Sequence, residues 1–234
     1  MALALWGSSG RMGQAINALE ECIPLNDLDN PPPSQVEAVI DFSSPAGAAA
    51  AANFCKQHKL PLVTGTTGLD DAEQKAINDA SSAIAIVQSG NMSLGITLLR
   101  QLVAKVAGTL SGFDIEILET HHRHKKDSPS GTALLLGEAA ARGRGSTLSE
   151  RARFTRHGRD EVRNPEDIGF AVRRGGGVYG EHEVSFMGDG ETLSLAHTAL
   201  SRDAFAKGAL EAGRWVIGKP AGLYNMGDVL SVEA

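Results

Sequence analysis

The regular alternation of short apolar runs with helical segments constrains the fold of this chain more than any other feature. Apolar runs at 2–6, 36–42, 61–64 and 83–87 each lead through a turn of small residues into a segment with helical periodicity. Short apolar runs bounded by turn residues are typical of strands buried on both faces of a parallel sheet. The alternation therefore predicts an α/β fold with a doubly wound parallel sheet.

A glycine-rich turn, Gly7–Gly13, follows the first predicted strand and opens a helix with Met12, Ile16 and Leu19 at helical spacing. Strand, glycine turn and helix form the context of a Rossmann-like dinucleotide-binding loop. Its glycines let the backbone approach a pyrophosphate at the helix N-terminus. Ser9 stands where the second glycine of the usual pattern would be, so a plain tight turn remains an alternative interpretation.

Two later turns of small residues, 65–68 and 89–92, also follow predicted strands. Ligands of open parallel sheets bind at the carboxyl ends of the strands. Each turn alone is compatible with an ordinary strand-to-helix connection. Three such turns on one edge favour a cofactor groove.

The choice between NADH and NADPH depends on the segment after the first helix. A dinucleotide fold holds the ribose hydroxyls with an acidic residue about 20 positions past the glycine loop, and an arginine nearby favours the 2′-phosphate of NADPH. Asp27 and Asp29 are the acidic candidates, although both are equally compatible with a role as turn formers. No lysine or arginine occurs between Met12 and Cys55, which favours NADH unless Arg11 folds back to hold a phosphate.

Residues 119–132 hold three of the seven histidines and three basic residues. A strand is predicted over 113–118 and a helix over 132–142, with Ser130 or Thr132 as its N-cap. Imidazoles suited to proton transfer thus lead into a helix N-terminus suited to a carboxylate or phosphate. The segment predicts a site for an anionic substrate beside proton donors. A solvated basic loop is the alternative, and because no zinc-type ligand spacing is present, no metal site is predicted.

The segment 151–200 changes to a strand-rich pattern, with candidate strands at 170–173, 182–186 and 192–197. This change predicts a second α+β domain with an open mixed sheet over 93–201, for substrate binding and oligomerisation. The dinucleotide-binding domain would span 1–92. A helix over 203–217 and the tail after it would complete that first domain with residues 202–234.

Bulk properties restrict the location and partners of the chain. The net charge of −6 argues against a general nucleic-acid surface, and no apolar run is long enough to span a bilayer. The start of the chain lacks the basic region of a signal peptide, and Cys22 and Cys55 do not make a disulfide framework. A cytoplasmic protein with a small-molecule substrate, no nucleic acid and no membrane partner is expected.

Five motifs together resemble the dihydrodipicolinate reductase (4-hydroxy-tetrahydrodipicolinate reductase) family of the lysine and diaminopimelate pathway. The histidine-rich motif 119–133 is the most specific of them. The other four are Gly7–Gly13, Asp41–Pro45, Gly65–Gly68 and Ser89–Ser93. Their order and spacing cover nearly the whole chain.

The resemblance implies NAD(P)H-dependent reduction of a cyclic dicarboxylic imine by an enzyme that is usually a homotetramer. It makes His121 a proton donor and acceptor, makes Lys125 a proton donor, and places His122, Gly131 and Thr132 on the substrate, where Ser130 would join them at the helix N-terminus. The chain is shorter than typical members between its first helix and Val36, so their acidic and basic pair has no clear equivalent here. The implied cofactor contacts are Gly7, Ser8, Ser9, Gly10, Arg11, Met12, Gly65, Thr66, Thr67, Ser89, Gly90, Asn91 and Met92.

Rival functions make different demands on the sequence. A semialdehyde dehydrogenase acting through a thioester needs a cysteine in its catalytic domain, whereas both cysteines lie in the predicted nucleotide domain. A short-chain dehydrogenase needs tyrosine with lysine four residues on, but Tyr179 and Tyr224 are followed at that spacing by acidic residues. A non-catalytic NADH sensor remains an alternative, distinguished by binding NADH without consuming it.

Overall fold

The computed structural model describes residues 2–158 and 162–231, which belong to two compact units. The first unit comprises Met1–Leu94 together with Arg202–Ala234, and the second comprises Gly95–Ser201. The chain thus leaves the first unit once and returns to it.

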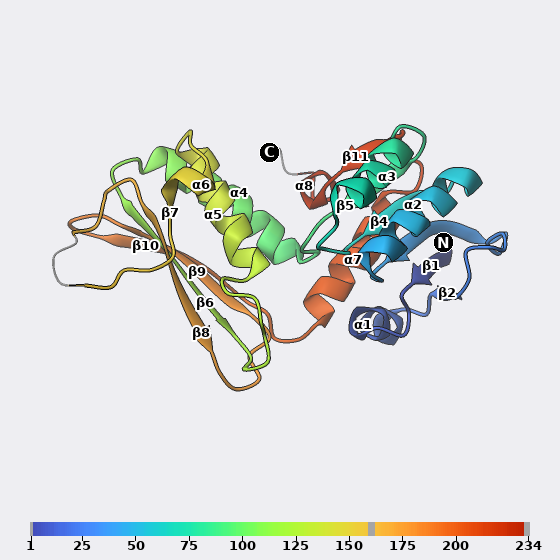
Figure 1. Ribbon diagram of the computed structural model, residues 1–234, viewed down its shortest axis with the longest axis horizontal. Coiled ribbons are helices and arrows are strands. Elements are labelled where there is room, and N and C mark those ends of the chain that lie inside the picture. Colours follow the sequence, from blue (N-terminus) through green and yellow to red (C-terminus); the bar gives the residue numbers. More distant parts are fainter. Residues whose placement is uncertain (1, 159–161, 232–234) are drawn as a thin grey trace. The chain divides into compact units, whose positions relative to one another are not determined.

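The first unit is built on a six-stranded sheet in which every pair of neighbouring strands is parallel (Figure 1). Its strand order is β11-β5-β4-β3-β1-β2, so the direction of winding reverses beside β1. This topology confirms the predicted doubly wound, Rossmann-like sheet. The strands are β1 (Ala2–Trp6), β2 (Ile23–Leu25), β3 (Val36–Asp41), β4 (Leu62–Thr64), β5 (Ala85–Gln88) and β11 (Gly222–Tyr224).

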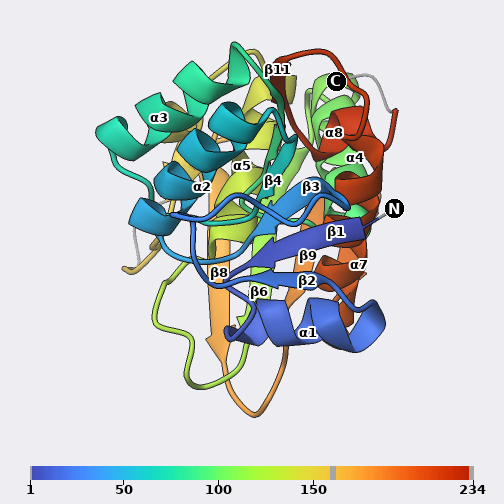
Figure 2. The same ribbon diagram turned by 90° about the vertical axis from the view of Figure 1, so that its right-hand side faces the viewer.

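Helices cover both faces of this sheet (Figure 2). Leu3 and Leu5 of β1 pack with α1 (Arg11–Leu19) and α7 (Asp203–Trp215). Ala4, which points to the opposite face, packs with α2 (Pro45–His58) and α3 (Asp71–Ser81). Burial on both faces explains why these strands are apolar without alternation. A short helix, α8 (Met226–Val229), follows β11.

Serine and proline start α2 as the sequence predicts. Ser44 is the N-cap, its Oγ accepts a hydrogen bond from the Gly47 N–H at 3.2 Å, and Pro45 is the first helical residue. The side chain supplies an acceptor for an N–H that has no partner within the helix, while proline has no N–H to satisfy there.

The second unit contains a mixed five-stranded sheet in the order β10-β9-β6-β8-β7 (Figure 1). β6 runs parallel to β8 and antiparallel to β9, while β10 is antiparallel to β9 and β7 parallel to β8. The expected open mixed sheet is confirmed. The strands are β6 (Asp114–His121), β7 (Ala152–Arg153), β8 (Ile168–Arg174), β9 (Glu181–Met187) and β10 (Thr192–Thr198).

Two helices, α4 (Leu94–Thr109) and α5 (Gly131–Gly143), pack on one face of this sheet, and α6 (Leu148–Arg151) precedes β7. Ile115 and Ile117 of β6 lie in the core with them. In the part of the second unit that the structure describes, no helix covers the opposite face of the sheet. None of the helices within residues 2–158 and 162–231 has the length and apolar character needed to cross a membrane.

The structure corrects one prediction near the histidine-rich segment and decides between the alternatives of another. The strand predicted to end at Leu118 continues to His121, so His121 is the last residue of β6 and does not lie in the loop. Of the two candidate N-caps of α5, the structure selects Ser130, whose Oγ accepts a hydrogen bond from the Ala133 N–H at 3.2 Å. The short elements α6, β7 and α8 were not predicted, because segments of two to four residues carry too little periodicity.

Candidate active site

Two glycines of the turn after β1, Gly7 and Gly13, have no room for a side chain. Gly7 has φ +88°, and a Cβ placed on it would lie 2.6 Å from the Phe42 carbonyl oxygen. A Cβ on Gly13 would lie 2.4 Å from the carbonyl oxygen of Gly7, so α1 packs directly against the turn. Gly10, the N-cap of α1, offers no side-chain cap to the first turn of the helix. The N–H groups of this turn are therefore suited to an anion such as a pyrophosphate.

A buried carboxylate, Asp41, organises the neighbouring turns at the same edge of the sheet. Asp41 ends β3 and is fully buried. Its oxygens accept hydrogen bonds from the Ser43 N–H at 3.0 Å and the Ser43 Oγ at 2.5 Å. They also accept from Thr64 Oγ1 at 2.7 Å and Thr66 Oγ1 at 2.8 Å. Asp41 thus fixes the turn after β4, where Gly65, Thr66 and Thr67 are predicted to contact the cofactor.

The turn after β5 is held by its own polar groups. Ser89 Oγ donates to the Asn91 carbonyl oxygen at 2.7 Å, and Asn91 Oδ1 accepts from the Ser93 N–H at 2.8 Å. Met92 is only 2% exposed and belongs to the core, so its side chain is not available to a ligand in this conformation. The three turns predicted to bind the cofactor follow three strands of one parallel sheet.

The loop after β2 carries the two acidic candidates for ribose recognition. One carboxylate oxygen of Asp27 accepts from the Asp29 N–H at 2.8 Å, and the other accepts from Asn30 Nδ2 at 2.7 Å. Asp27 thus acts as a turn former in this loop, and it remains exposed.

In the second unit, His121 is held by Glu119 two residues earlier on β6. His121 Nδ1 lies 2.6 Å from Glu119 Oε2, and the glutamate is 1% exposed. Arg174, at the end of β8, donates to both oxygens of Glu119 at 2.8 Å each. Parallel pairing of β6 with β8 places His121 opposite Arg174. A Cβ on Gly180 would lie 3.0 Å from His121 Nε2, so the absence of a side chain there leaves space at this nitrogen.

Ser130 and His182 extend this network to the N-terminus of α5. The Ser130 N–H donates to Glu119 Oε1 at 2.9 Å, and Ser130 Oγ lies 3.1 Å from His182 Nε2. The His182 ring makes an edge contact with the His121 ring at 5.1 Å between centroids. Antiparallel pairing of β6 with β9 places His182 opposite Glu119.

The ionisation of these groups follows from burial and neighbouring charges. Burial, aided by the neighbouring His121, lowers the pKa of His182 to about 4, so it is neutral at pH 7. Burial also lowers the pKa of His121, against the opposite effect of Glu119. Burial alone would raise the pKa of Glu119, but hydrogen bonds from Arg174, His121 and the Ser130 N–H bring it below its ordinary value. At pH 7 Glu119 is therefore an anion, and His121 and His182 are neutral.

The loop between β6 and α5 carries the remaining candidates. Lys125 Nζ pairs with the Asp127 carboxylate at 2.9 Å. The loop is tied to the β8–β9 connection, since the His122 N–H donates to the Val178 carbonyl oxygen at 2.8 Å. Nδ1 of His122 is buried and has no hydrogen-bond partner among the described residues, which leaves a polar atom for a ligand or water. Gly131 and Thr132 open α5, and a Cβ on Gly131 would meet no atom within 4 Å.

Sequence reasoning missed the roles of Asp41, Glu119, Arg174 and His182. Glu119 lay inside the singled-out motif, but only the geometry shows which side chains it joins. Arg174 and His182 come from strands far along the chain, and pairing with β6 brings them to the site. The signal that could have indicated them is a polar residue at a strand position expected to be buried, such as His182 in β9.

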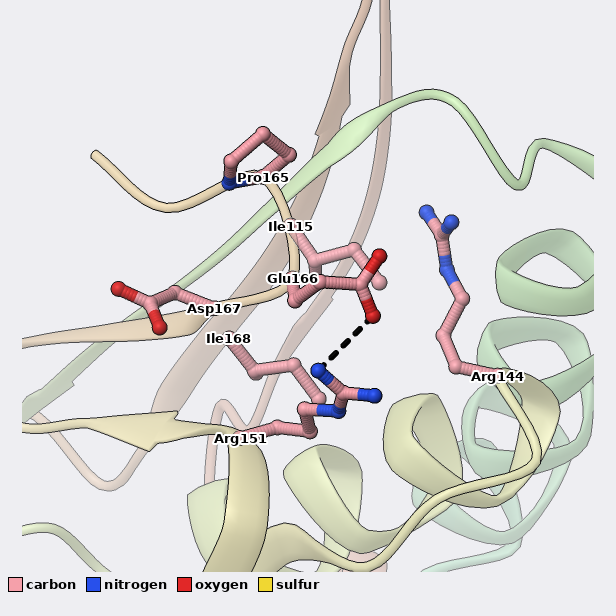
Figure 3. A pocket seen from close by; sticks show the side chains of 7 residues that line it. All are labelled: Ile115, Arg144, Arg151, Pro165, Glu166, Asp167 and Ile168. Carbon is pink, nitrogen blue, oxygen red and sulfur yellow. Dashed lines mark ion pairs between the residues drawn. The ribbon is translucent and has the colours of Figure 1, made fainter. Parts of the chain in front are cut away.

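A small pocket elsewhere in the second unit is not part of this site (Figure 3). Its volume is about 10 Å³, which is about the space of one water molecule. Figure 3 shows the ion pair between Arg151 and Glu166. Arg151 Nη1 lies 2.8 Å from Glu166 Oε2. The Arg144 guanidinium donates to the carbonyl oxygens of Leu110 and Phe113, after the end of α4. These arginines have structural partners.

Two further kinds of site would be a cysteine nucleophile and a cluster of metal ligands. Cys22 and Cys55 are both buried, and burial raises the pKa of both thiols, that of Cys22 to about 11. Neither cysteine is a ready nucleophile, because thiolate is the reactive form. Within residues 2–158 and 162–231, no three histidine, cysteine or acidic side chains gather as a metal site.

A doubly wound parallel sheet with a glycine turn after its first strand is typical of dinucleotide-binding proteins, and here it is joined in one chain to a unit with a buried Glu–His pair and a lysine. Comparison with known proteins specifies the family. The model of the dihydrodipicolinate reductase N-terminus matches residues 23–92, and the model of its C-terminus matches residues 95–230. The chain belongs to the dihydrodipicolinate reductase family, and the resemblance noted in the sequence is confirmed.

Individual relatives agree with this assignment. The 4-hydroxy-tetrahydrodipicolinate reductase of Caulobacter vibrioides is 44% identical over 253 residues, covering 99% of this chain and 97% of the relative. The enzyme of the same name from Methylocella silvestris is 51% identical over 197 residues, covering 84% of this chain and 72% of the relative. A dipicolinate-bound dihydrodipicolinate reductase from Paenisporosarcina sp. TG-14 shares the fold, with a TM-score of 0.75 and 22% identity over 96% of this chain and 98% of the other. The chain is an oxidoreductase, and its family implies a nicotinamide cofactor.

Proposed function

We propose that this chain reduces 4-hydroxy-tetrahydrodipicolinate, by way of dihydrodipicolinate, to tetrahydrodipicolinate in lysine and diaminopimelate biosynthesis. The observation that carries the proposal is the Glu119–His121 pair at the end of β6. It lies on the same short segment as Lys125 and the N-terminus of α5. This segment combines groups for proton transfer with groups for holding a carboxylate, which the reduction of a cyclic dicarboxylic imine requires.

The glycine turn after β1 fits a dinucleotide, because its glycines leave no room for a Cβ and the first turn of α1 has no side-chain cap. Residues 7–12, 65–67 and 89–92 would hold the cofactor, with Met92 contributing backbone only. The reduced nicotinamide supplies the hydride when it is bound. The Asp41 hydrogen bonds keep the turn at Thr66 in one conformation, so binding requires little reordering.

The residues of the second unit bind the substrate and transfer the proton. We assign the substrate carboxylates to Ser130, Gly131 and Thr132 at the start of α5, together with His122, whose buried Nδ1 has no hydrogen-bond partner among the described residues. Reduction adds one hydride and one proton to the ring. Lys125 supplies that proton as hydride arrives, or His121 supplies it from Nε2 once its ring has taken up a proton from solvent. Asp127 holds the Lys125 ammonium in place before the substrate carboxylate enters.

We also propose that NADH is preferred over NADPH. The loop after β2 carries Asp27 and Asp29, and no lysine or arginine occurs from residue 13 to residue 54. The 2′-phosphate of NADPH would bring about two negative charges to an acidic loop without a cation on its own segment. Arg11, at the start of α1, is the one nearby residue in sequence that offers a positive charge.

The family resemblance implies a homotetramer, and the uncovered face of the second unit's sheet offers a surface for contact between subunits. Leu118 and Thr120 of β6 are half-buried on this face although no described helix of the unit covers it. We propose this face as the contact between subunits, to be tested by light scattering coupled to gel filtration. A cytoplasmic location and the absence of nucleic-acid and membrane partners stay predictions from the sequence.

The decisive test is nicotinamide absorbance loss with substrate made in situ from pyruvate and aspartate semialdehyde by the preceding synthase. NADH and NADPH are run side by side. Oxidation that requires both enzymes supports the reductase, and a higher kcat/KM with NADH supports the cofactor proposal. A clear preference for NADPH would instead assign the phosphate to Arg11 or another residue. Tight NADH binding without oxidation would favour the sensor.

A further inference from the structure

The Glu119 carboxylate is saturated by donors. Arg174 donates to both of its oxygens at 2.8 Å, and the Ser130 N–H donates to Oε1 at 2.9 Å. The remaining neighbour is Nδ1 of His121, 2.6 Å from Oε2. A bidentate pair of this kind fixes direction as well as charge. The carboxylate therefore has one place and one orientation.

This arrangement determines which nitrogen of His121 carries the proton. Glu119 is ionised, because Arg174, His121 and the Ser130 N–H lower its pKa against the effect of burial. An ionised carboxylate only accepts hydrogen bonds, so the hydrogen on the short contact belongs to Nδ1 of His121. At neutral pH the lone pair of the ring then lies on Nε2, beside Gly180, where a Cβ would intrude to 3.0 Å.

We propose that Glu119 and Arg174 are the positioning residues of His121, holding its ring in the Nδ1–H tautomer so that Nε2 is the atom that exchanges a proton with the substrate. This inference rests on the proposed role of His121 in the reductase reaction. It goes beyond that role by assigning the choice of tautomer to two residues that act through the His121 ring.

The charges around His121 give the two residues opposite effects on it. Glu119, on the same strand, favours the protonated ring, whereas Arg174 from β8 and Lys125 from the following loop disfavour it. His182 from β9 is neutral at pH 7. Removing the Arg174 charge should therefore raise the pKa of His121, and removing the Glu119 charge should lower it.

Replacing the carboxylate by an amide makes a sharp prediction. In Glu119→Gln, an amide nitrogen at the Oε1 position would face two fixed donors, from Ser130 and Arg174. At the Oε2 position it faces one fixed donor and His121, which can move its own proton. The amide nitrogen should take the Oε2 position and turn His121 into an acceptor at Nδ1. The ring proton should then move to Nε2.

The experiment combines imidazole nitrogen NMR of the full chain with steady-state kinetics across pH. The His121 signal is assigned by its loss in His121→Asn. We expect the Nδ1–H tautomer in the wild type, the Nε2–H tautomer in Glu119→Gln, and a fall in kcat on the order of 10²-fold in that variant with a smaller change in KM. Arg174→Met should shift the His121 titration to higher pH, and Arg174→Lys should restore most of the wild-type value.

Controls separate positioning from folding. Arg156→Met removes an arginine that pairs with Glu116, which lies on β6 as Glu119 does. This variant should change neither the His121 tautomer nor kcat. The single variant Glu119→Gln could unfold because Arg174 loses its partner. In that case the double variant Glu119→Gln with Arg174→Met, which removes both charges, is used in its place. His121 keeping its proton on Nδ1 in the amide variants would overturn the proposal, as would a tautomer change that leaves kcat unaltered. If the wild type reduces the substrate with neither cofactor, the proposed function fails, while the NMR result still decides the tautomer.

Discussion

Among the described residues, each unit buries one carboxylate near the carboxyl end of a strand, and the two carboxylates differ in their partners. Asp41 of the first unit is held by neutral donors, namely the hydroxyls of Ser43, Thr64 and Thr66 and a backbone N–H. Glu119 of the second unit is held by an arginine, a histidine and a backbone N–H. Neutral donors fix the conformation of the carboxylate. Partners that carry or gain a charge also make that conformation depend on which groups are protonated. This difference supports the proposal that the first unit holds the cofactor loops and that the second unit does the acid–base chemistry.

The largest expected effect separates the two regions by kinetics. His121→Ala and Lys125→Ala should each lower kcat by about 10²- to 10⁴-fold, because each removes a proton-transferring group, while NADH binding persists. Thr66→Val at the Asp41 region should instead raise the KM for NADH by about tenfold, which corresponds to about 1.4 kcal/mol. Steady-state kinetics and fluorescence titration of NADH measure both. Near-normal turnover of Lys125→Ala would remove that residue from its proposed role.

A second comparison concerns stability. Glu119→Ala should destabilise the protein by about 3–5 kcal/mol, because it leaves the Arg174 guanidinium without its carboxylate. Asp41→Ala should cost less, about 2–3 kcal/mol, since the hydroxyls left behind are neutral and can rotate to other partners. Urea unfolding of the two variants tests the order. Equal losses would mean that the charge of the partner does not matter.

Acidification should weaken the second unit before the first. Burial lowers the pKa of His121, His182 and His197, which all lie in the second unit. The pKa of His182 is about 4 in the folded protein and about 6.5 when unfolded, so the unfolded chain binds more protons below pH 6.5. This contribution to stability is present above pH 6.5 and is lost as the pH falls towards 4, by about 3 kcal/mol in total. Hydrogen exchange at pH 5 should rise first in β6 and β9, and His182→Gln should reduce the effect.

The smallest effect compares two helix caps. Ser44 caps α2 in the first unit and Ser130 caps α5 in the second, each accepting one backbone N–H at 3.2 Å. Both alanine variants should lose about 1 kcal/mol of stability. Only Ser130→Ala should also weaken substrate binding, because Ser130 lies in the network with Glu119 and His182. Thermal unfolding and substrate KM for the pair check this, and a raised KM in Ser44→Ala would argue against it.

Much of the fold could be predicted from the sequence because its signals are local. Ser44 followed by Pro45, or the glycine turn after residue 6, specifies structure within a few residues. The open sheet of the second unit was also predictable from its strand-rich segment. The partners of His121 were not, because Arg174 and His182 reach it through strand pairing over more than fifty residues. The periodicity of a single sequence does not show which strands pair. The interaction of Arg174 with Glu119 could therefore not be predicted.

The first unit is interrupted by the whole of the second, and this affects how the protein is made. A ribosome synthesises β1 to β5 first, then the uninterrupted segment 95–201, and only afterwards α7 and β11. Until then β5 is an unpaired sheet edge, and the core that Ala206, Ala209 and Ala212 of α7 help to close stays exposed. We expect nascent chains that stall before residue 202 to carry a completed second unit beside a first unit that chaperones can still recognise.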